Sequence, residues 1–165
     1  MKVDLNEIKD WREFEELIAD FFREEYKNDQ NNIKSVVVDL SGKGSDGGRD
    51  ILITFRFNDS LVYFDRKWVV QCKFYNKTVS KSHIADVNIP TLIHQYGANG
   101  YILITKGDVS SKLTEMFEDL QQNCSFGYQY LVWTGSQLVS KMRDKPALAQ
   151  YYFPKSSQSS KKNKK

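Results

Sequence analysis

The sequence predicts an α/β fold in which a mixed central β-sheet carries helices on both faces. Three strand-like segments follow one another at 33–40, 49–57 and 67–75. Further along, helical and strand-like segments alternate, and the short apolar segment at 100–105 is of the kind that is buried on both faces. Consecutive strands favour hairpins, whereas strands separated by helices favour parallel pairing, so we expect both kinds in one sheet.

A helix precedes these strands, and we expect its cap to be Asp4 or Asn6. Its apolar residues recur at helical spacing: Ile8, Trp11, Phe14, Leu17, Ile18, Phe21 and Phe22. The segment 58–66 is expected to join the second and third strands as a hairpin connection. The segment 80–96 is expected to be mostly helical, with Pro90 kinking or interrupting it. The remaining predicted elements are a helix, a strand and a helix, at 108–123, 128–133 and 134–143.

Length and composition predict one folded domain. The 165 residues are 40% hydrophobic and 27% charged, which is ordinary for a globular protein with a real core. We expect the domain to span 1–154 and to be followed by a disordered basic tail or linker stub at 155–165. Without the five lysines of that tail, 19 basic residues face 21 acidic ones. A uniformly basic nucleic-acid binder is therefore excluded, and contacts with phosphates would have to come from local patches.

Composition excludes several other classes of protein. The N-terminus has no apolar stretch of a secretory signal, and no apolar run approaches the roughly 18 residues that cross a bilayer. The two cysteines, Cys72 and Cys124, form neither a disulfide framework nor a zinc pattern. We therefore expect a cytoplasmic location and no membrane partner.

The glycine-rich stretch "LSGKGSDGGRDILITF" at 40–55 is the most informative part of the chain. Its glycines fit a nucleotide-binding spacing, but such a loop must lead into a helix, whose N-terminus holds the phosphates. Here the loop leads into a strand rich in β-branched residues, so a nucleotide cradle is not expected. A flexible turn would explain the glycines, although it would leave the aspartates of the stretch unexplained.

Alternation along the third strand places Gln71 and Lys73 on one face, opposite the apolar face that includes Cys72. Asp50 opens the preceding strand, and hairpin geometry brings it roughly opposite Gln71 and Lys73. Polar groups in an apolar strand need a partner when they are buried. The alternative is an ordinary surface lysine and glutamine on a half-exposed strand, and spacing alone does not decide between the two.

A carboxylate, an amide oxygen and a lysine at one end of a hairpin suit metal-assisted hydrolysis of a phosphodiester. Mg²⁺ prefers oxygen ligands, which Asp50, the side chain of Gln71 and the backbone carbonyl of Cys72 would supply. Lys73 would orient the attacking water or neutralise charge on the phosphate. Glu15 interrupts the apolar stripe of the first helix, where a metal-bound water is one partner for it and a position at the rim of the core is the alternative.

Three motifs in this order resemble the Mrr-like branch of the PD-(D/E)XK nuclease superfamily: "FEEL" at 14–17, "GSDGGRDI" at 44–51 and "QCK" at 71–73. The later "GYILITKGDVS" is similar to the strand and helix start that follow the catalytic hairpin in that family. The resemblance covers roughly residues 11–140. It implies a restriction-endonuclease-like core within the α/β class, and Mg²⁺ as the cofactor, with Mn²⁺ as a substitute.

The resemblance also implies a role for each matching position. Asp50 matches the metal-binding carboxylate, Lys73 the catalytic lysine, and Gln71 a further ligand position. Glu15 matches the helix carboxylate that acts through water. In the loop, Asp46 matches the first aspartate, and Gly47 and Gly48 would permit a positive φ and a close approach to a phosphate. Flanking basic residues are candidate phosphate contacts: Lys43, Arg49, Lys77 and Lys81.

By resemblance, the chain is a Mg²⁺-dependent endonuclease for double-stranded DNA that serves bacterial defence and restriction. Such domains are often the effector part of a larger protein with a sensor or ATPase module, and the end of the chain fits that arrangement. Cutting two strands would favour a homodimer or larger oligomer. Two alternatives stay open: a resolvase-like or repair nuclease on the same fold, and a nucleic-acid-binding module with dormant activity. The sequence does not distinguish DNA from RNA.

Overall fold

The computed structural model describes residues 2–27, 32–41 and 48–157. Its centre is one five-stranded sheet with the strand order β1-β2-β3-β4-β5. The strands are β1 (Ile33–Leu40), β2 (Ile51–Asn58), β3 (Tyr63–Lys73), β4 (Gly100–Thr105) and β5 (Gln129–Trp133). The first three strands pair antiparallel, and β4 and β5 add to β3 in parallel. The prediction of a mixed sheet is therefore confirmed.

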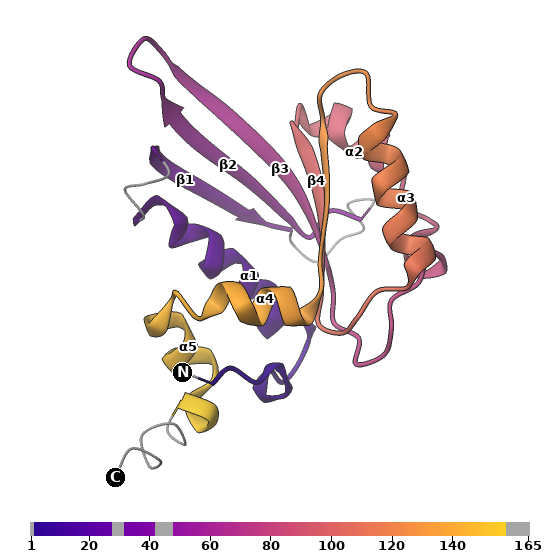
Figure 1. Ribbon diagram of the computed structural model, residues 1–165. Helices are drawn as coiled ribbons and strands as arrows, with labels where there is room; N and C mark the ends of the chain where they lie inside the picture. Colours follow the sequence, from indigo (N-terminus) through magenta and orange to yellow (C-terminus); the bar gives the residue numbers. More distant parts are fainter. Residues whose placement is uncertain (1, 28–31, 42–47, 158–165) are drawn as a thin grey trace.

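Helices cover both faces of the sheet, as the sequence predicts (Figure 1). On one face lie α1 (Trp11–Arg23), α4 (Gly135–Met142) and α5 (Pro146–Tyr152), and on the other lie α2 (Ile89–Tyr96) and α3 (Ser111–Gln122). Each face has its own apolar core. All six residues of β4 are buried, because this strand has a neighbour on each side and helices above and below.

The first helix begins later than the sequence predicts. Asp10, not Asp4 or Asn6, caps α1, and its Oδ1 accepts a hydrogen bond of 2.9 Å from the backbone N–H of Glu13. Asp4 instead caps a short 3₁₀ turn, Leu5–Glu7. Both aspartates satisfy backbone donors that a helix start leaves unpaired. The sequence therefore contains two successive capping aspartates, and the predicted cap of α1 is wrong.

Pro90 interrupts the helix expected over 80–96. The segment divides into a 3₁₀ turn, Lys81–Ile84, and α2, which begins at Ile89 with Pro90 in its first turn. Proline is tolerated there because the first turn has no hydrogen-bond partner for its nitrogen. Asn88 caps α2 by accepting a hydrogen bond of 3.1 Å from the N–H of Thr91.

The β2–β3 hairpin extends beyond β4 and β5. β3 begins at Tyr63, inside the segment expected to be a connection, because Asp59 closes the turn by accepting hydrogen bonds from the N–H groups of Leu61 and Val62. Pairing between β3 and β4 starts only at Trp68. Residues 63–66 therefore pair with β2 on one side and have no strand of the described residues on the other.

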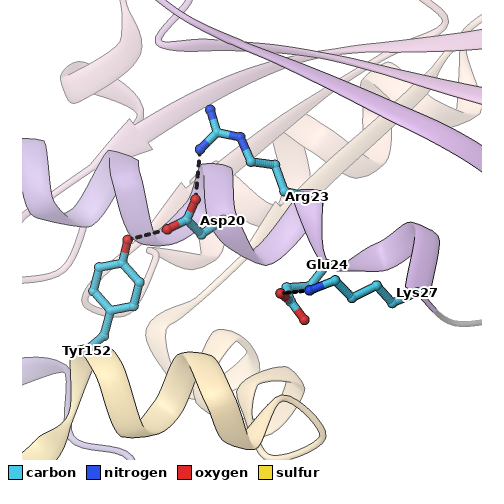
Figure 2. Close-up of polar contacts among 5 residues, drawn as sticks. All are labelled: Asp20, Arg23, Glu24, Lys27 and Tyr152. Atoms are coloured by element: carbon cyan, nitrogen blue, oxygen red, sulfur yellow. Dashed lines mark hydrogen bonds and ion pairs between the residues drawn. The ribbon is translucent and has the colours of Figure 1, made fainter.

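α5 and the described residues after it contact the N-terminal part of the chain. The hydroxyl of Tyr152 donates a hydrogen bond of 2.7 Å to Asp20 of α1, which also accepts one of 2.7 Å from Arg23; Figure 2 shows these contacts and the ion pair between Lys27 and Glu24. Beyond α5, residues 154–157 are helical, and the N–H groups of Lys155 and Ser156 donate to Glu7.

The described helical structure therefore extends to residue 157, where Glu7 accepts hydrogen bonds from the helix start that follows α5; the domain bounds 1–154 and 155–165 stay a prediction. The rest of the expected tail, 158–165, lies outside the described residues. Within the part of the chain that the structure describes, no helix is long and apolar enough to cross a bilayer.

We expect Tyr152→Phe to lower the free energy of unfolding by about 1 kcal/mol, because it removes a hydrogen bond to a charged group while keeping the buried ring. Urea denaturation measures this change. Tyr151→Phe is the matched control, since the neighbouring ring is 76% exposed and its substitution should change stability little. Equal effects of the two substitutions would contradict the anchoring role of the Tyr152 hydroxyl.

Candidate active site

Asp50 lies directly before β2 and is held against β3 by backbone and side chain together. Its N–H donates a hydrogen bond of 2.9 Å to the carbonyl of Val70. Its Oδ2 accepts one of 2.6 Å from the N–H of Cys72. The side chain thus takes the place of the next backbone carbonyl in the β2–β3 ladder, and it fixes the carboxylate beside residues 71–73.

The side chains of β3 alternate at this point. Val70 packs in the core under α1, whereas Val69 packs in the core under α2 and α3. By strand parity, Gln71 and Lys73 project toward the α2–α3 side. Burial raises the pKa of Asp50, while the Cys72 N–H bond and the positive charge of Lys73 act in the opposite direction. The charge of Lys73 therefore acts on the carboxylate of Asp50.

Cys72 contributes to the site through its backbone N–H and C=O groups and not through its thiol. Burial raises the pKa of the Cys72 thiol well above its usual value, and the negative charges of Asp50 and Glu15 raise it further, which keeps the sulfur protonated. Within one residue of a strand, N–H and C=O point to the same side. The carbonyl of Cys72 therefore points toward the side on which Asp50 lies.

Glu15 reaches the same region from α1, on the other face of the sheet. Its pKa is raised to about 7, first by burial and then by the negative charge of Asp50, while Arg12 acts in the opposite direction. The neighbouring Glu16 is exposed. Two carboxylates in a partly buried place repel each other, and a cation beside them would relieve that repulsion.

Gln71 is buried, with 4% of its surface exposed. Its Oε1 accepts a hydrogen bond of 2.7 Å from the hydroxyl of Tyr101, which lies in β4. Burial raises the pKa of Tyr101 well above its usual value, so the hydroxyl keeps its proton. No motif in the sequence marks Tyr101 as a functional residue. The one indication in the sequence is that the apolar strand "GYILIT" contains a tyrosine, whose hydroxyl needs a hydrogen-bond partner when it is buried.

Gly48 ends the glycine-rich loop in a backbone conformation that favours glycine. Its φ is +97°, and a Cβ added there would lie 2.6 Å from Val87 and 3.1 Å from Nε2 of Gln71. The expected positive φ is therefore present at Gly48, and the close approach is to Gln71 and Val87. The other loop candidates, Lys43, Asp46 and Gly47, lie outside the described residues.

The candidate phosphate contacts differ in their surroundings. The guanidinium carbon of Arg49 lies 4.7 Å from the ring centre of Tyr96, a cation–π distance. Lys77 and Lys81 are exposed on the segment that follows β3. Lys106 is a further basic residue near the site, and no sequence motif indicates it. Its backbone N–H donates a hydrogen bond of 3.0 Å to the carbonyl of Lys73, and its ammonium lies 4.4 Å from the ring centre of Phe74.

The donor chemistry of the site fits a hard divalent cation. Asp50 is bonded to Cys72, Gln71 is the residue before Cys72 in β3, and the charge of Asp50 acts on Glu15 of α1. Carboxylate, amide and carbonyl oxygens are ligands that suit Mg²⁺ or Mn²⁺. Among the described residues, no group of three or more His, Cys, Asp and Glu side chains could hold a metal ion. A site here would therefore depend on Gln71 and on the backbone of Cys72 as well as on carboxylates.

We expect Gly48→Ala to lower the free energy of unfolding by roughly 2–4 kcal/mol, because the new methyl group meets Val87 in a backbone conformation that is already unfavourable for alanine. Gly97→Ala is the matched control: it also has a positive φ, of +56°, but open space around it, so its effect should be about 1 kcal/mol. Chemical denaturation of both variants checks the ranking, and a larger effect at Gly97 would contradict it.

The raised pKa of Glu15 predicts a pH dependence of stability in metal-free buffer. Between its usual pKa of 4.5 and about 7, the folded state holds a proton that the unfolded state has released, so stability falls as pH rises through this window. Because water screens this half-exposed carboxyl group, we expect the free energy of unfolding to fall by about 1–2 kcal/mol across the window. Glu15→Gln should abolish this part of the fall, whereas Glu16→Gln should retain it. Unfolding curves from pH 4 to 8 with a chelator test the difference, and identical pH profiles for wild type and Glu15→Gln would refute it.

Two solved structures share this arrangement of elements. The first is described as the MspJI restriction endonuclease in complex with a 27-mer oligonucleotide; it has a TM-score of 0.56 and 18% identity over 87% of this chain and 32% of that one. The second is described as the DNA modification-dependent restriction endonuclease AspBHI, with a TM-score of 0.50 and 17% identity over 92% of this chain and 40% of that one. At these identities, the likeness concerns the fold.

This chain therefore spans about a third of the length of the first structure and two fifths of the second. Among curated proteins, none matches the sequence. A profile of the restriction endonuclease family Mrr_cat matches residues 7–142, which include Glu15, Asp50, Gln71 and Lys73. The chain belongs to the Mrr_cat family of restriction endonucleases, whose activity is the cleavage of DNA.

Proposed function

We propose that this chain is a divalent-metal-dependent endonuclease that hydrolyses phosphodiester bonds of double-stranded DNA. The observation that carries the proposal is the bond between Cys72 N–H and Asp50 Oδ2 at 2.6 Å. It holds the carboxylate beside the one strand segment that also presents Gln71 and Lys73. Family membership supports the substrate class, and the oxygen donor set supports the metal.

In this proposal, Asp50, Gln71 and the carbonyl of Cys72 hold Mg²⁺, for which Mn²⁺ is a substitute. When bound, the ion polarises the phosphate and makes water a better nucleophile at neutral pH. In the reaction, the water oxygen bonds to phosphorus, one ester bond breaks, and the leaving oxygen takes up a proton.

Two side chains of this protein act on those protons and charges. Lys73 is next in sequence to the residue that binds Asp50, and its ammonium stabilises negative charge that develops on the phosphate. The carboxylate of Glu15 can accept a hydrogen bond from a water molecule at the site. We assign Glu15 to the orientation of water, because it reaches the site from α1 and not from the hairpin.

The biological setting that we propose is bacterial defence, in the cytoplasm, as the effector part of a larger protein. The limited share of the similar structures that this chain covers supports a multidomain arrangement. AspBHI is described as dependent on DNA modification, so modified DNA belongs in any substrate panel. Cleavage of both strands favours a homodimer. The proposed phosphate contacts are Arg49, Lys77 and Lys81 among the described residues, and Lys43 outside them. The loop residues Asp46, Gly47 and Gly48 are proposed to hold the loop or to contact the substrate side.

We expect Asp50→Asn and Lys73→Ala each to reduce Mg²⁺-dependent cleavage of plasmid DNA by about 100-fold or more, because each removes a charge that acts on the phosphate or the ion. Asparagine keeps an oxygen that can accept the Cys72 hydrogen bond, so the fold is retained. Rates on plasmid, linear and single-stranded DNA, with and without modified bases, measure the effect, and circular dichroism checks folding.

Lys67→Ala is the matched control, since Lys67 is a lysine of the same strand that pairs opposite Thr54, away from Asp50, and its activity should match the wild type. Ca²⁺ in place of Mg²⁺ should support DNA binding without cleavage. Cleavage at the wild-type rate by Asp50→Asn or by Lys73→Ala would overturn the proposal.

A further inference from the structure

The phenol of Tyr101 is completely buried, with 0% of its surface exposed, in the core between the sheet and the α2–α3 layer. Its ring packs against Phe117, with the centroids 6.1 Å apart. A phenylalanine would fill the same space without removing a hydroxyl from water, which costs free energy unless a partner is present. The partner is the amide oxygen of Gln71, at 2.7 Å.

The register of the sheet explains how the two groups meet. In the parallel pairing of β3 and β4, Tyr101 lies opposite Val69, and Leu103 lies opposite Gln71. The Cα of Tyr101 is therefore offset by two residues along the sheet from the Cα of Gln71. All of these side chains belong to the same face by strand parity. A long aromatic ring that leans along the strand spans this diagonal, which shorter side chains cannot do. The hydroxyl thus reaches the strand end at which Asp50 is held.

The amide of Gln71 is confined on its other side as well. Its Nε2 lies 3.1 Å from the point where a Cβ of Gly48 would stand, so the amide occupies the gap between Tyr101 and the end of the glycine-rich loop. In this arrangement, the phenolic proton is donated to the amide oxygen. An amide oxygen has two lone pairs, and the hydrogen bond with Tyr101 uses one of them.

We propose that Tyr101 is a positioning residue for metal binding: its hydroxyl orients the amide of Gln71 so that the second lone pair of Oε1 can bind the divalent cation. This inference rests on the proposed function, because it assumes that Gln71 is a ligand. Hydrogen bonds to metal ligands from surrounding residues hold those ligands in place, and their loss typically weakens metal affinity or activity by about 10–100-fold.

The test uses Tyr101→Phe, which removes one oxygen atom and keeps the ring. Affinity for Mn²⁺ is measured without DNA, from the rise in unfolding temperature as the concentration of Mn²⁺ increases. We expect the concentration that gives half of the rise to be about tenfold higher, or more, in Tyr101→Phe than in the wild type. The half-saturating Mn²⁺ concentration for plasmid cleavage should increase by a similar factor, with much of the rate restored at high Mn²⁺.

A double-mutant cycle separates positioning from a general effect on the core. In a Gln71→Ala background, Tyr101→Phe should leave Mn²⁺ affinity unchanged, because the hydroxyl then has no ligand to orient. Tyr130→Phe is the matched control: Tyr130 is also buried in the core under α2 and α3, and its loss of a hydroxyl should not alter Mn²⁺ affinity.

The outcomes distinguish this inference from the proposed function. If Gln71→Ala weakens Mn²⁺ binding and Tyr101→Phe does not, or if Tyr101→Phe acts equally in both backgrounds, the positioning role is overturned while the nuclease proposal stands. If the wild type neither gains stability from Mn²⁺ nor cleaves any DNA of the panel, the proposed function fails, and this inference fails with it.

Discussion

A single hydrogen bond, from the N–H of Cys72 to the carboxylate of Asp50, determines the geometry of the candidate site. β2 has not yet begun at Asp50, so a side chain replaces the backbone as the acceptor in the ladder. The bond aligns the carboxylate with β3 and compensates part of the free energy that its burial requires. The alternation of β3 then decides which side chains stand next to it.

The site lies where the two cores of the protein meet at one end of the sheet. Glu15 approaches from α1 on one face of the sheet, whereas the buried Gln71 is bonded to Tyr101, which belongs to the core under α2 and α3. Each core thus contributes a polar group at its rim, and Asp50 lies between them. Burial, and then the negative charge of Asp50, raise the pKa of Glu15 to about 7, and a cation beside the two carboxylates would relieve their repulsion.

The sequence predicts the parts of the fold that depend on local pattern. The bounds of β1 and β4 are predicted correctly, because a β-branched or aliphatic run stands between polar turns at 33–40 and 100–105. The start of β3 is missed, since the exposed residues at 63–66, two aromatic and two charged, show no alternation of apolar and polar side chains, and pairing with β2 alone orders them. The helix α5 is missed as well, because it is short and is fixed by a distant contact, from Tyr152 to Asp20.

The same distinction applies to the candidate site. Asp50, Gln71 and Lys73 can be found from spacing and from motif order, because they lie on two adjacent strands joined by one hairpin. The hydrogen bond from Tyr101 cannot be found in this way, since it depends on the parallel register between β3 and β4. Nor does the sequence specify that Arg49 lies over Tyr96; proximity along the chain suggests a phosphate contact, whereas the fold gives the guanidinium an aromatic neighbour.

The hairpin that carries Asp50 also makes most of the ligand set local in the chain. Asp50 and Cys72 are only 22 residues apart, so closing the loop between them requires little chain entropy, and a hairpin can form within microseconds. The carboxylate, the amide, the carbonyl and the lysine can therefore assemble early during folding, before α1 and β4 dock. Amide hydrogen exchange at Cys72 would consequently report on the last region to open rather than on fraying of the surrounding helices.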